Sequence, residues 1–275
     1  MILVVGANGM LGRDLMALLG DKARGVDVEE IDITSLESTE RVVRTLHPAV
    51  VINCAAFTNV DGCEANVETA MQVNGEGVAH LAIATKMIGA RLVQISTDYI
   101  FDGGKGSPYL EDDPPHPLSI YGESKFTGEM NAAFNPYHII VRTQWLYGLH
   151  GNNFVETMLR MADERNVLDV VDDQIGSPTW TVDLSRAIIA LLDKNCTGVY
   201  HAANTGYCSW NDFAKAIFEE VSQDIIVRGM TTEQLNRPAQ RPLYSTLDCG
   251  KLQRDTGFSL QPWRDALKSY LRLRK

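Results

Sequence analysis

A tyrosine and a lysine four positions apart are the residues of this sequence best suited to acid–base chemistry. Tyr121 and Lys125 begin and end the stretch Tyr-Gly-Glu-Ser-Lys, and on a helix this spacing places both side chains on one face. An unaided phenol is a poor acid at neutral pH because its pKa is about 10. A neighbouring ammonium group stabilises the phenolate, so we expect Lys125 to move the pKa of Tyr121 toward neutrality. The pair predicts a site of proton transfer.

Hydroxyl groups that can orient a carbonyl substrate precede this pair. Thr97 lies just past a predicted strand, and its hydroxyl can hydrogen-bond a substrate carbonyl and fix its orientation. Ser96 is the competing candidate for that role. We predict that Thr97, Tyr121 and Lys125 form the catalytic set. Thr97, Asp98 and Tyr99 are predicted to bind the substrate.

A glycine-rich loop near the amino terminus predicts a binding site for a dinucleotide. The loop joins the apolar run Ile2–Val5 to a stretch with apolar residues at helical spacing. Gly6 permits a tight turn, Gly9 lets the backbone approach a diphosphate, and Gly12 allows close packing of helix on sheet. The helix N-terminus adds free N–H groups and a partial positive charge. The residues predicted to contact the cofactor here are Gly6, Asn8, Gly9, Met10, Leu11 and Gly12.

Acidic residues follow the predicted second strand, at the distance from the glycines that dinucleotide sites require. Asp27 is expected to accept hydrogen bonds from the adenosine ribose, while Asp32 and Ile33 are expected to border the adenine. A carboxylate repels the additional phosphate of NADP, whereas Arg13 is a nearby cation that could attract it. We therefore expect NADH to serve at least as well as NADPH.

Short apolar runs alternate with helical stretches, and these elements must position the residues above. Strands are expected at Ile2–Val5, Ala49–Cys54, Arg91–Ser96 and His138–Val141, with a long helix over Thr69–Ile88 and a loop over 102–119. This order is typical of a parallel sheet with helices on both faces, which binds ligands beyond the strand ends. We predict an α/β fold, a Rossmann-type doubly wound sheet with a smaller C-terminal lobe. Residues 1–148 form the dinucleotide-binding core, to which later segments return, and residues 149–275 form mainly the substrate-binding lobe.

The second half of the chain is less regular. A strand is expected at Asp169–Val171 and helices at Asp183–Leu192 and Trp210–Val221, while Thr231–Tyr244 is polar and contains two prolines. The last of these segments is therefore predicted to be irregular.

Composition excludes several classes of protein. The formal net charge of -10 disfavours binding to nucleic acid. The odd number of scattered cysteines argues against a disulfide framework, and no apolar run has the length of a membrane helix. No histidine–carboxylate spacing suggests a metal site, so none is predicted. We expect a cytoplasmic protein with reduced thiols.

The residues also match a known family. The chain resembles the extended short-chain dehydrogenases, and more closely the dTDP-4-dehydrorhamnose reductase family. The matching segments are Gly6–Gly12, Asn53–Asp61, Ser96–Gly103, Tyr121–Lys125, Arg142–Gly148, Asp173–Thr179 and Arg241-Pro242. The Ser-Thr-Asp-Tyr and Asp-Gln-Ile-Gly-Ser-Pro-Thr segments are the more specific ones.

The resemblance implies a reaction that spacing alone does not give. A reduced nicotinamide would deliver hydride to the C4 ketone of dTDP-4-dehydro-L-rhamnose and yield dTDP-L-rhamnose. By similarity, Tyr121 donates the proton, Lys125 tunes it and binds the nicotinamide ribose, and Thr97 orients the sugar.

The resemblance also implies further contacts. Ala55, Ala56 and Thr58 would line the cofactor cleft. Trp145 would lie against the sugar, and the guanidinium fork of Arg241 would pair with a diphosphate oxygen. Some relatives bind a metal at a dimer interface through an acidic cluster that we do not find in this sequence. A homodimer is possible, and a metal-linked one is not expected.

Two alternatives remain open. A sugar-nucleotide epimerase or dehydratase of the same superfamily shares the Tyr–Lys pair but needs other acids or bases at the ketone. A regulatory subunit could keep the fold and the nucleotide pocket without catalysis, as the methionine adenosyltransferase β subunit does. An intact set of Thr97, Tyr121 and Lys125 favours an enzyme, because a binding module does not need it.

Overall fold

A six-stranded parallel sheet forms the centre of the protein. The computed structural model describes residues 1–274, and its main sheet has the strand order β10-β5-β4-β3-β1-β2. The strands are β1 (Ile2–Val5), β2 (Ala23–Val26), β3 (Val50–Asn53), β4 (Arg91–Thr97), β5 (His138–Thr143) and β10 (Gly198–His201). The chain reverses its direction of winding between β1 and β3, which is where ligands bind in such sheets. The Rossmann-type α/β fold predicted from the sequence is confirmed.

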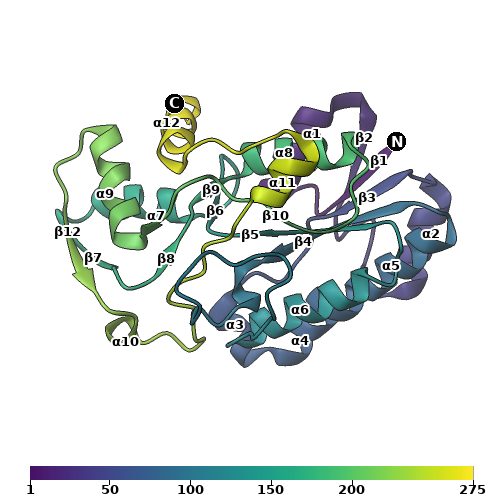
Figure 1. Cartoon of the computed structure of the whole chain (residues 1–275), viewed down its shortest axis with the longest axis horizontal. Helices are drawn as coiled ribbons and strands as arrows, with labels where there is room; N and C mark the ends of the chain where they lie inside the picture. The colour runs from purple at the N-terminus through teal and green to yellow at the C-terminus, as the bar shows by residue number, and fades with distance from the viewer. Residues whose placement is uncertain (275) are drawn as a thin grey trace.

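Helices cover both faces of this sheet (Figure 1). On one face lie α1 (Met10–Leu19), α8 (Thr181–Asp193) and α11 (Gly250–Thr256), and on the other α2 (Leu36–Leu46), α3 (Val60–Ala65), α4 (Val67–Met71), α5 (Gly77–Met87) and α6 (Ile120–Ala132). Two apolar cores fill the spaces between sheet and helices, one around Leu15 and Ile188 and the other around Val43 and Leu81. Because β10, α8 and α11 come from the second half of the chain, that half contributes to the main sheet and its cover.

The helix expected at Thr69–Ile88 is not uniform. Residues 67–87 are helical throughout, but a π-helical turn, Gln72–Glu76, separates α4 from α5. The widened turn holds Asn74, which is 1% exposed and bonds the backbone of Phe57 through both its amide oxygen and its amide nitrogen. A long-range contact of this kind leaves no mark on the helical periodicity of the sequence.

A third apolar core lies at the other end of the molecule. It gathers Tyr147, Phe213 and Tyr270 among 18 buried residues. The elements around it are β6 (Leu146–Tyr147), α7 (Phe154–Ala162), β7 (Val167–Val171), β8 (Ile175–Gly176), β9 (Thr179–Trp180), β11 (Cys208–Ser209), α9 (Trp210–Val221), β12 (Ile226–Met230) and α12 (Trp263–Leu273). This core fits the predicted smaller lobe, whose boundary at residue 148 stays a prediction.

Short elements complete the chain. Helical turns occur at η1 (Gly20–Lys22), η3 (Asp98–Ile100) and α10 (Thr232–Leu235). The helical turn α10 lies inside Thr231–Tyr244, the segment predicted to be irregular, so that prediction was wrong for these four residues. Thr231 and Gln234 form a capping box there, a local arrangement that can start a helical turn before Pro238.

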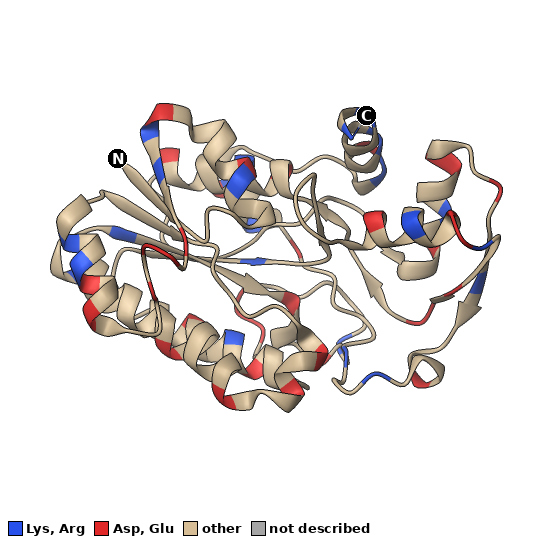
Figure 2. Cartoon of the chain, turned by 180° about the vertical axis from the view of Figure 1, so that it is seen from behind, with Lys and Arg blue, Asp and Glu red and all other residues tan. Residues whose placement is uncertain are grey.

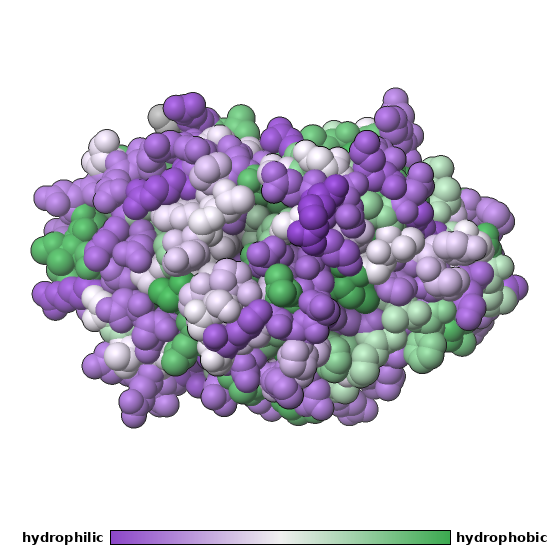
Figure 3. Space-filling view, in the orientation of Figure 1, coloured by the Kyte–Doolittle hydropathy of each residue, from purple (hydrophilic) through white to green (hydrophobic). Residues whose placement is uncertain are grey.

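The surface is mostly polar. Figure 2 shows acidic residues gathered along the layer of α3, α4, α5 and α6, and Figure 3 shows a hydrophilic face with small hydrophobic areas. In the described part of the chain, no helix combines the length and the apolar character that a membrane span requires.

Candidate active site

The turn after β4 and the first turn of α6 bring Thr97 and Tyr121 together. Ser119 caps α6 by accepting a hydrogen bond from the Gly122 N–H. A Cβ on Gly122 would lie 2.2 Å from the carbonyl oxygen of Tyr99, so glycine lets α6 approach the turn closely. The rings of Tyr99 and Tyr121 meet edge to face at 5.4 Å, and the Thr97 hydroxyl is near enough to Tyr121 to lower the pKa of its phenol.

The structure separates the two candidate hydroxyls. The buried Ser96 hydroxyl donates to Glu129 Oε1 of α6 at 2.5 Å, so its hydrogen is already used inside the protein. The Thr97 hydroxyl lies at the carboxyl end of β4, where it donates to Asp98 Oδ1 at 3.1 Å and accepts from the Tyr99 N–H at 3.2 Å. Thr97 is therefore the better candidate for orienting a substrate.

Lys125 lies one turn further along α6 and is held in place. Its side chain is 4% exposed, and Nζ donates to the carbonyl oxygen of Ile95 at 2.7 Å. Burial lowers the pKa of Lys125 to about 8, against the opposing effect of the Glu129 carboxylate. The ammonium form therefore depends on the nearby negative charge.

The expected shift of Tyr121 toward neutrality is wrong for this structure. Burial raises the pKa of Tyr121 above its ordinary value of 10.0, and the charge of Asp98 raises it further. The Thr97 hydrogen bond acts in the other direction. The Lys125 ammonium donates to the Ile95 carbonyl and not to the phenol. The group that lowers the pKa of Tyr121 is therefore the Thr97 hydroxyl.

The glycine loop has the geometry expected of a diphosphate cradle. Gly6 has a φ of +76°, and a Cβ on Gly12 would lie 2.3 Å from the Gly6 carbonyl oxygen, so both positions require glycine. Gly9 precedes α1 in extended conformation and offers no side-chain cap. The first N–H groups of α1 therefore remain available to an anion. The predicted contacts of Met10 and Leu11 would use these N–H groups, since the Leu11 side chain is buried in the core.

A cavity of about 360 Å³ adjoins this loop. Its lining includes the predicted cofactor residues Gly6, Gly9, Asp27, Asp32, Ile33, Ala55 and Ala56. Thr58 is exposed and lies outside this lining, so its predicted contact is not supported by the cavity. The site brings together an acidic ribose partner and apolar walls, which fit an adenosine.

Asp27 already connects the loop to the end of β2. Its carboxylate accepts from the backbone N–H of Asn8 at 2.8 Å and of Val28 at 2.9 Å. A second cavity of about 390 Å³ lies beside it, lined in part by Asn8, Arg13 and Glu30. The Arg13 guanidinium donates to the Asn8 carbonyl at 3.1 Å, so one cation and two carboxylates border the position that an additional ribose phosphate would occupy.

The predicted substrate residues fall into two groups. Arg241 pairs with Asp61 at 3.0 Å, and its charge and hydrogen bond lower the pKa of Tyr99, which burial nevertheless raises to about 12. Arg241 therefore belongs to the same surroundings as Tyr121. Asp98 is 1% exposed, and other protein groups bond both its oxygens, so its side chain is not open to a sugar.

Trp145 belongs to the second group, in the lobe. Its ring stacks on Trp210 at 3.6 Å and lies over Gly176, where a Cβ would come within 2.5 Å of the indole. The residue has a φ of 48°, an uncommon conformation for a large side chain. The backbone is therefore constrained to present this ring, and its contact with a sugar stays a prediction.

Several residues of the site escaped the sequence interpretation. Asn74 joins Phe57 of the cofactor loop to Ser124 of α6. Ser245 bonds Asp98 from the C-terminal part of the chain. Glu129 and Arg142 form a buried ion pair below Lys125. Their partners are distant in sequence or buried in the core. Only Glu129, four residues after Lys125, could have been recognised from local spacing.

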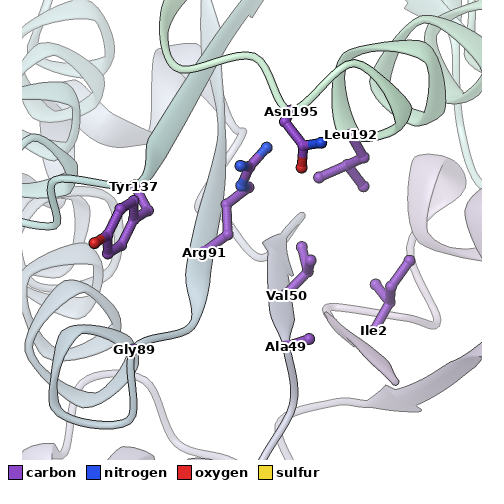
Figure 4. Close-up of a pocket in the computed structure, with 8 residues that line it drawn as sticks. All are labelled: Ile2, Ala49, Val50, Gly89, Arg91, Tyr137, Leu192 and Asn195. Atoms are coloured by element: carbon purple, nitrogen blue, oxygen red, sulfur yellow. The ribbon is translucent and has the colours of Figure 1, made fainter.

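Another cavity, of about 340 Å³, lies at the opposite edge of the sheet (Figure 4). Ile2, Val50 and Arg91 line it at the amino ends of their strands, with Tyr137 and Asn195 nearby. The predicted catalytic residues lie at the carboxyl ends, so this cavity is separate from the candidate active site. No cluster of three potential metal ligands occurs within residues 1–274.

Comparison with known proteins shows the family of this chain. A family model described as the RmlD substrate binding domain matches residues 1–274. The chain belongs to this family. The dTDP-4-dehydrorhamnose reductase of Streptomyces griseus is 45% identical over 277 residues, which are 96% of this chain and 91% of that protein.

Solved structures of this RmlD family have the same fold throughout. The dTDP-4-dehydrorhamnose reductase of Clostridium acetobutylicum ATCC 824 is 44% identical and has a TM-score of 0.97, over 99% of this chain and 98% of that one. The Bacillus anthracis enzyme, solved in complex with NADP, is 38% identical with a TM-score of 0.96 over the same shares. The family resemblance seen in the sequence is confirmed.

Proposed function

We propose that the protein reduces the C4 ketone of dTDP-4-dehydro-L-rhamnose to dTDP-L-rhamnose with NADH or NADPH, in dTDP-rhamnose biosynthesis. The observation that carries the proposal is the grouping of Thr97, Tyr121 and Lys125 at the carboxyl edge of the sheet, where the glycine loop and Asp27 line a cavity of about 360 Å³. The RmlD family membership and relatives named dTDP-4-dehydrorhamnose reductase support the choice of sugar.

The cavity fits a dinucleotide on the chemistry of its donors. The free N–H groups at the start of α1 would hold the diphosphate, and Asp27 the adenosine ribose. Lys125 would bind the nicotinamide ribose. When bound, the nicotinamide supplies the hydride.

The residues of the chain supply the proton and the orientation. Tyr121 donates its hydroxyl proton to the C4 oxygen as negative charge develops there. Thr97 directs a hydrogen bond to the same region and fixes the ketone. Arg241, now paired with Asp61, would instead bind a diphosphate oxygen of the substrate. Trp145 would form a wall for the sugar.

The test is a reduction assay with the purified protein. Incubation with NADH or NADPH and dTDP-4-dehydro-L-rhamnose should consume the nicotinamide absorbance and yield dTDP-L-rhamnose, identified by mass and NMR. Tyr121→Phe should lower kcat by roughly 10²–10⁴-fold while cofactor still binds. Tyr137→Phe, an exposed tyrosine of the far cavity, is the matched control. Retention of more than a tenth of the wild-type turnover by Tyr121→Phe would overturn the assignment.

The place of action and the assembly are part of the proposal. The substrate and the reduced nicotinamide are cytoplasmic metabolites, so we place the protein in the cytoplasm. A homodimer is proposed as its assembly, and light scattering of the purified protein would show it. No metal is assigned to the reaction.

A further inference from the structure

A segment from the C-terminal part of the chain crosses the candidate active site, and we call residues 241–247 the strap. Its backbone is fixed on both sides of Ser245. The Ser245 N–H donates to the Ile175 carbonyl at 3.0 Å, and the Thr246 carbonyl accepts from the Tyr109 N–H at 2.8 Å. Near its start, a Cβ on Gly103 would touch the Leu243 backbone. The strap therefore holds Ser245 at a defined place against the turn after β4.

Ser245 ends a chain of buried hydrogen bonds that begins at Thr97, beside Tyr121. The Ser245 hydroxyl donates to Asp98 Oδ2 at 2.5 Å, and the Thr97 hydroxyl donates to Asp98 Oδ1 at 3.1 Å. Thr97 also accepts from the Tyr99 N–H at 3.2 Å, and its hydroxyl lowers the pKa of the adjacent Tyr121. Ser245, Asp98 and Thr97 are 2%, 1% and 6% exposed, so water does not compete for these bonds.

Thr97 has a single hydrogen to donate, and two groups compete for it. When Asp98 is ionised, it accepts the hydrogen of Thr97, which then offers Tyr121 only a lone pair. When Asp98 is protonated, its own hydrogen can go to Thr97, whose two lone pairs are then filled by Asp98 and the Tyr99 N–H. The Thr97 hydrogen is released toward Tyr121 and the substrate carbonyl, where negative charge develops during the reduction.

We propose that Ser245 and Asp98 are positioning residues that decide where Thr97 directs its hydroxyl hydrogen, and so whether that hydrogen reaches the reacting oxygens. The inference rests on the proposed reduction. It assigns a role to the strap that differs from binding the diphosphate through Arg241. It also explains why a carboxyl group is kept out of contact with solvent beside a proton donor.

The surroundings of Asp98 support a change of protonation in the working range. Burial raises the pKa of Asp98 to about 7, and the hydrogen bonds from Ser245 and Thr97 oppose the rise. The phenols of Tyr99 and Tyr121 face it from the turn and from α6. Beyond them lie Arg241 of the strap and Asp61 of α3, which partly neutralise each other.

The first test is the pH dependence of kcat in the wild type and four variants. In the wild type, kcat should fall as Asp98 ionises with rising pH. Loss of one donor to a developing charge costs roughly 10²-fold, so a fall of about tenfold or more is expected. Ser245→Ala removes a hydrogen bond that is stronger to the carboxylate than to the neutral acid, so the midpoint should rise by about 1 pH unit. Ser245→Thr keeps the hydroxyl and should restore the wild-type midpoint.

The matched control is Thr246→Val, which deletes a neighbouring strap hydroxyl that is buried without a partner among the described residues. Its midpoint should equal the wild type's. Asp98→Asn removes the ionisable carboxyl, so the fall in kcat near the Asp98 midpoint should disappear. The fall in kcat caused by deprotonation of Lys125, whose pKa is about 8, should remain. An unchanged midpoint in Ser245→Ala, or an equal shift in Thr246→Val, would overturn the inference.

A second measurement does not depend on turnover. Carboxyl-carbon NMR of protein labelled on aspartate should contain one resonance that disappears in Asp98→Asn. That resonance should titrate near neutral pH in the wild type and at higher pH in Ser245→Ala. The same midpoint in both proteins would refute the role of Ser245. Failure of the wild type to reduce the sugar would refute the proposed function, and the carbon titration would still decide the hydrogen-bond chain.

Discussion

The buried ion pair below Lys125 offers a direct test of how the catalytic lysine keeps its charge. Glu129 and Arg142 are 4% exposed as residues and are joined by three hydrogen bonds of 2.8 to 3.2 Å. A fourth guanidinium bond goes to the Glu111 carbonyl at 2.9 Å. Glu129 also accepts from Ser96 and raises the pKa of Lys125. Replacing Glu129 should therefore change both stability and titration.

The perturbation is Glu129→Gln, which keeps the shape and removes the charge. Breaking a buried pair leaves an uncompensated charge and costs about 3–5 kcal/mol. Gln retains one acceptor for Arg142, so we expect the lower end, about 3 kcal/mol. With a urea m value of at most about 3 kcal/mol per molar, the unfolding midpoint should fall by about 1 M or more. The pKa of Lys125 should fall below its present value of about 8, because its one stabilising carboxylate is gone.

The assays are urea unfolding followed by circular dichroism, and the pH dependence of kcat/KM at pH values where the variant stays folded. The high-pH fall in activity should move to lower pH in Glu129→Gln, because Lys125 loses its proton earlier. Glu123→Gln, at an exposed position of the same helix, should change neither quantity. A Glu129→Gln variant with wild-type stability and an unmoved high-pH fall would refute the reasoning, because the carboxylate would then support neither Arg142 nor Lys125.

Three further predictions concern other parts of the molecule. Trp145→Ala and Arg241→Ala should each raise the KM for the sugar nucleotide and leave the cofactor Kd unchanged; an equal loss of cofactor affinity would contradict their place on the substrate side. Arg13→Ala should lower kcat/KM for NADPH more than for NADH, and a wild-type preference for NADPH above about tenfold, worth ~1.4 kcal/mol, would show that the carboxylate of Asp27 does not discourage the phosphate. Burial lowers the pKa of His201 from 6.5 to about 3. The protein should therefore lose stability as the pH falls from about 6.5 toward 3, at about 1.4 kcal/mol per pH unit, because the unfolded chain binds a proton that the folded protein does not. His201→Gln should flatten this dependence of the unfolding free energy, measured at several pH values.

Much of the sheet and the cofactor side of the site follows from local sequence. The run Ile2–Val5, the glycine loop and the helical spacing after it lie within 19 residues, so periodicity and glycine chemistry suffice to predict them. The parallel order then places the ends of β1, β3 and β4 at one edge. Asp27, just after β2, and Thr97, the last residue of β4, follow as site candidates because the carboxyl ends of these strands lie at the same edge.

The substrate side depends on contacts that local patterns do not carry. Ser245 lies 147 positions from Asp98, and Asn74 reaches Phe57 from a π-helical turn that an even helical pattern does not predict. Residues 36–46 form an amphipathic helix capped by Ser35, which was not predicted although its spacing and cap are local. The contacts of Ser245 and Asn74 therefore could not be predicted from local sequence, whereas the helix over residues 36–46 could have been.

The acidity of Tyr121 is the point at which sequence reasoning and structure differ most usefully. The Tyr–Lys spacing predicts that Lys125 lowers the pKa of the phenol, yet the Lys125 ammonium is bonded to the Ile95 carbonyl, and burial raises that pKa. The Thr97 hydroxyl lowers it, and Asp98 holds the hydrogen that would do so. The acid is therefore strongest when Asp98 is neutral, and the same charge that raises the pKa of Tyr121 also withdraws its donor. Both effects act in one direction, so activity should depend on the protonation of Asp98 more steeply than either effect alone would require.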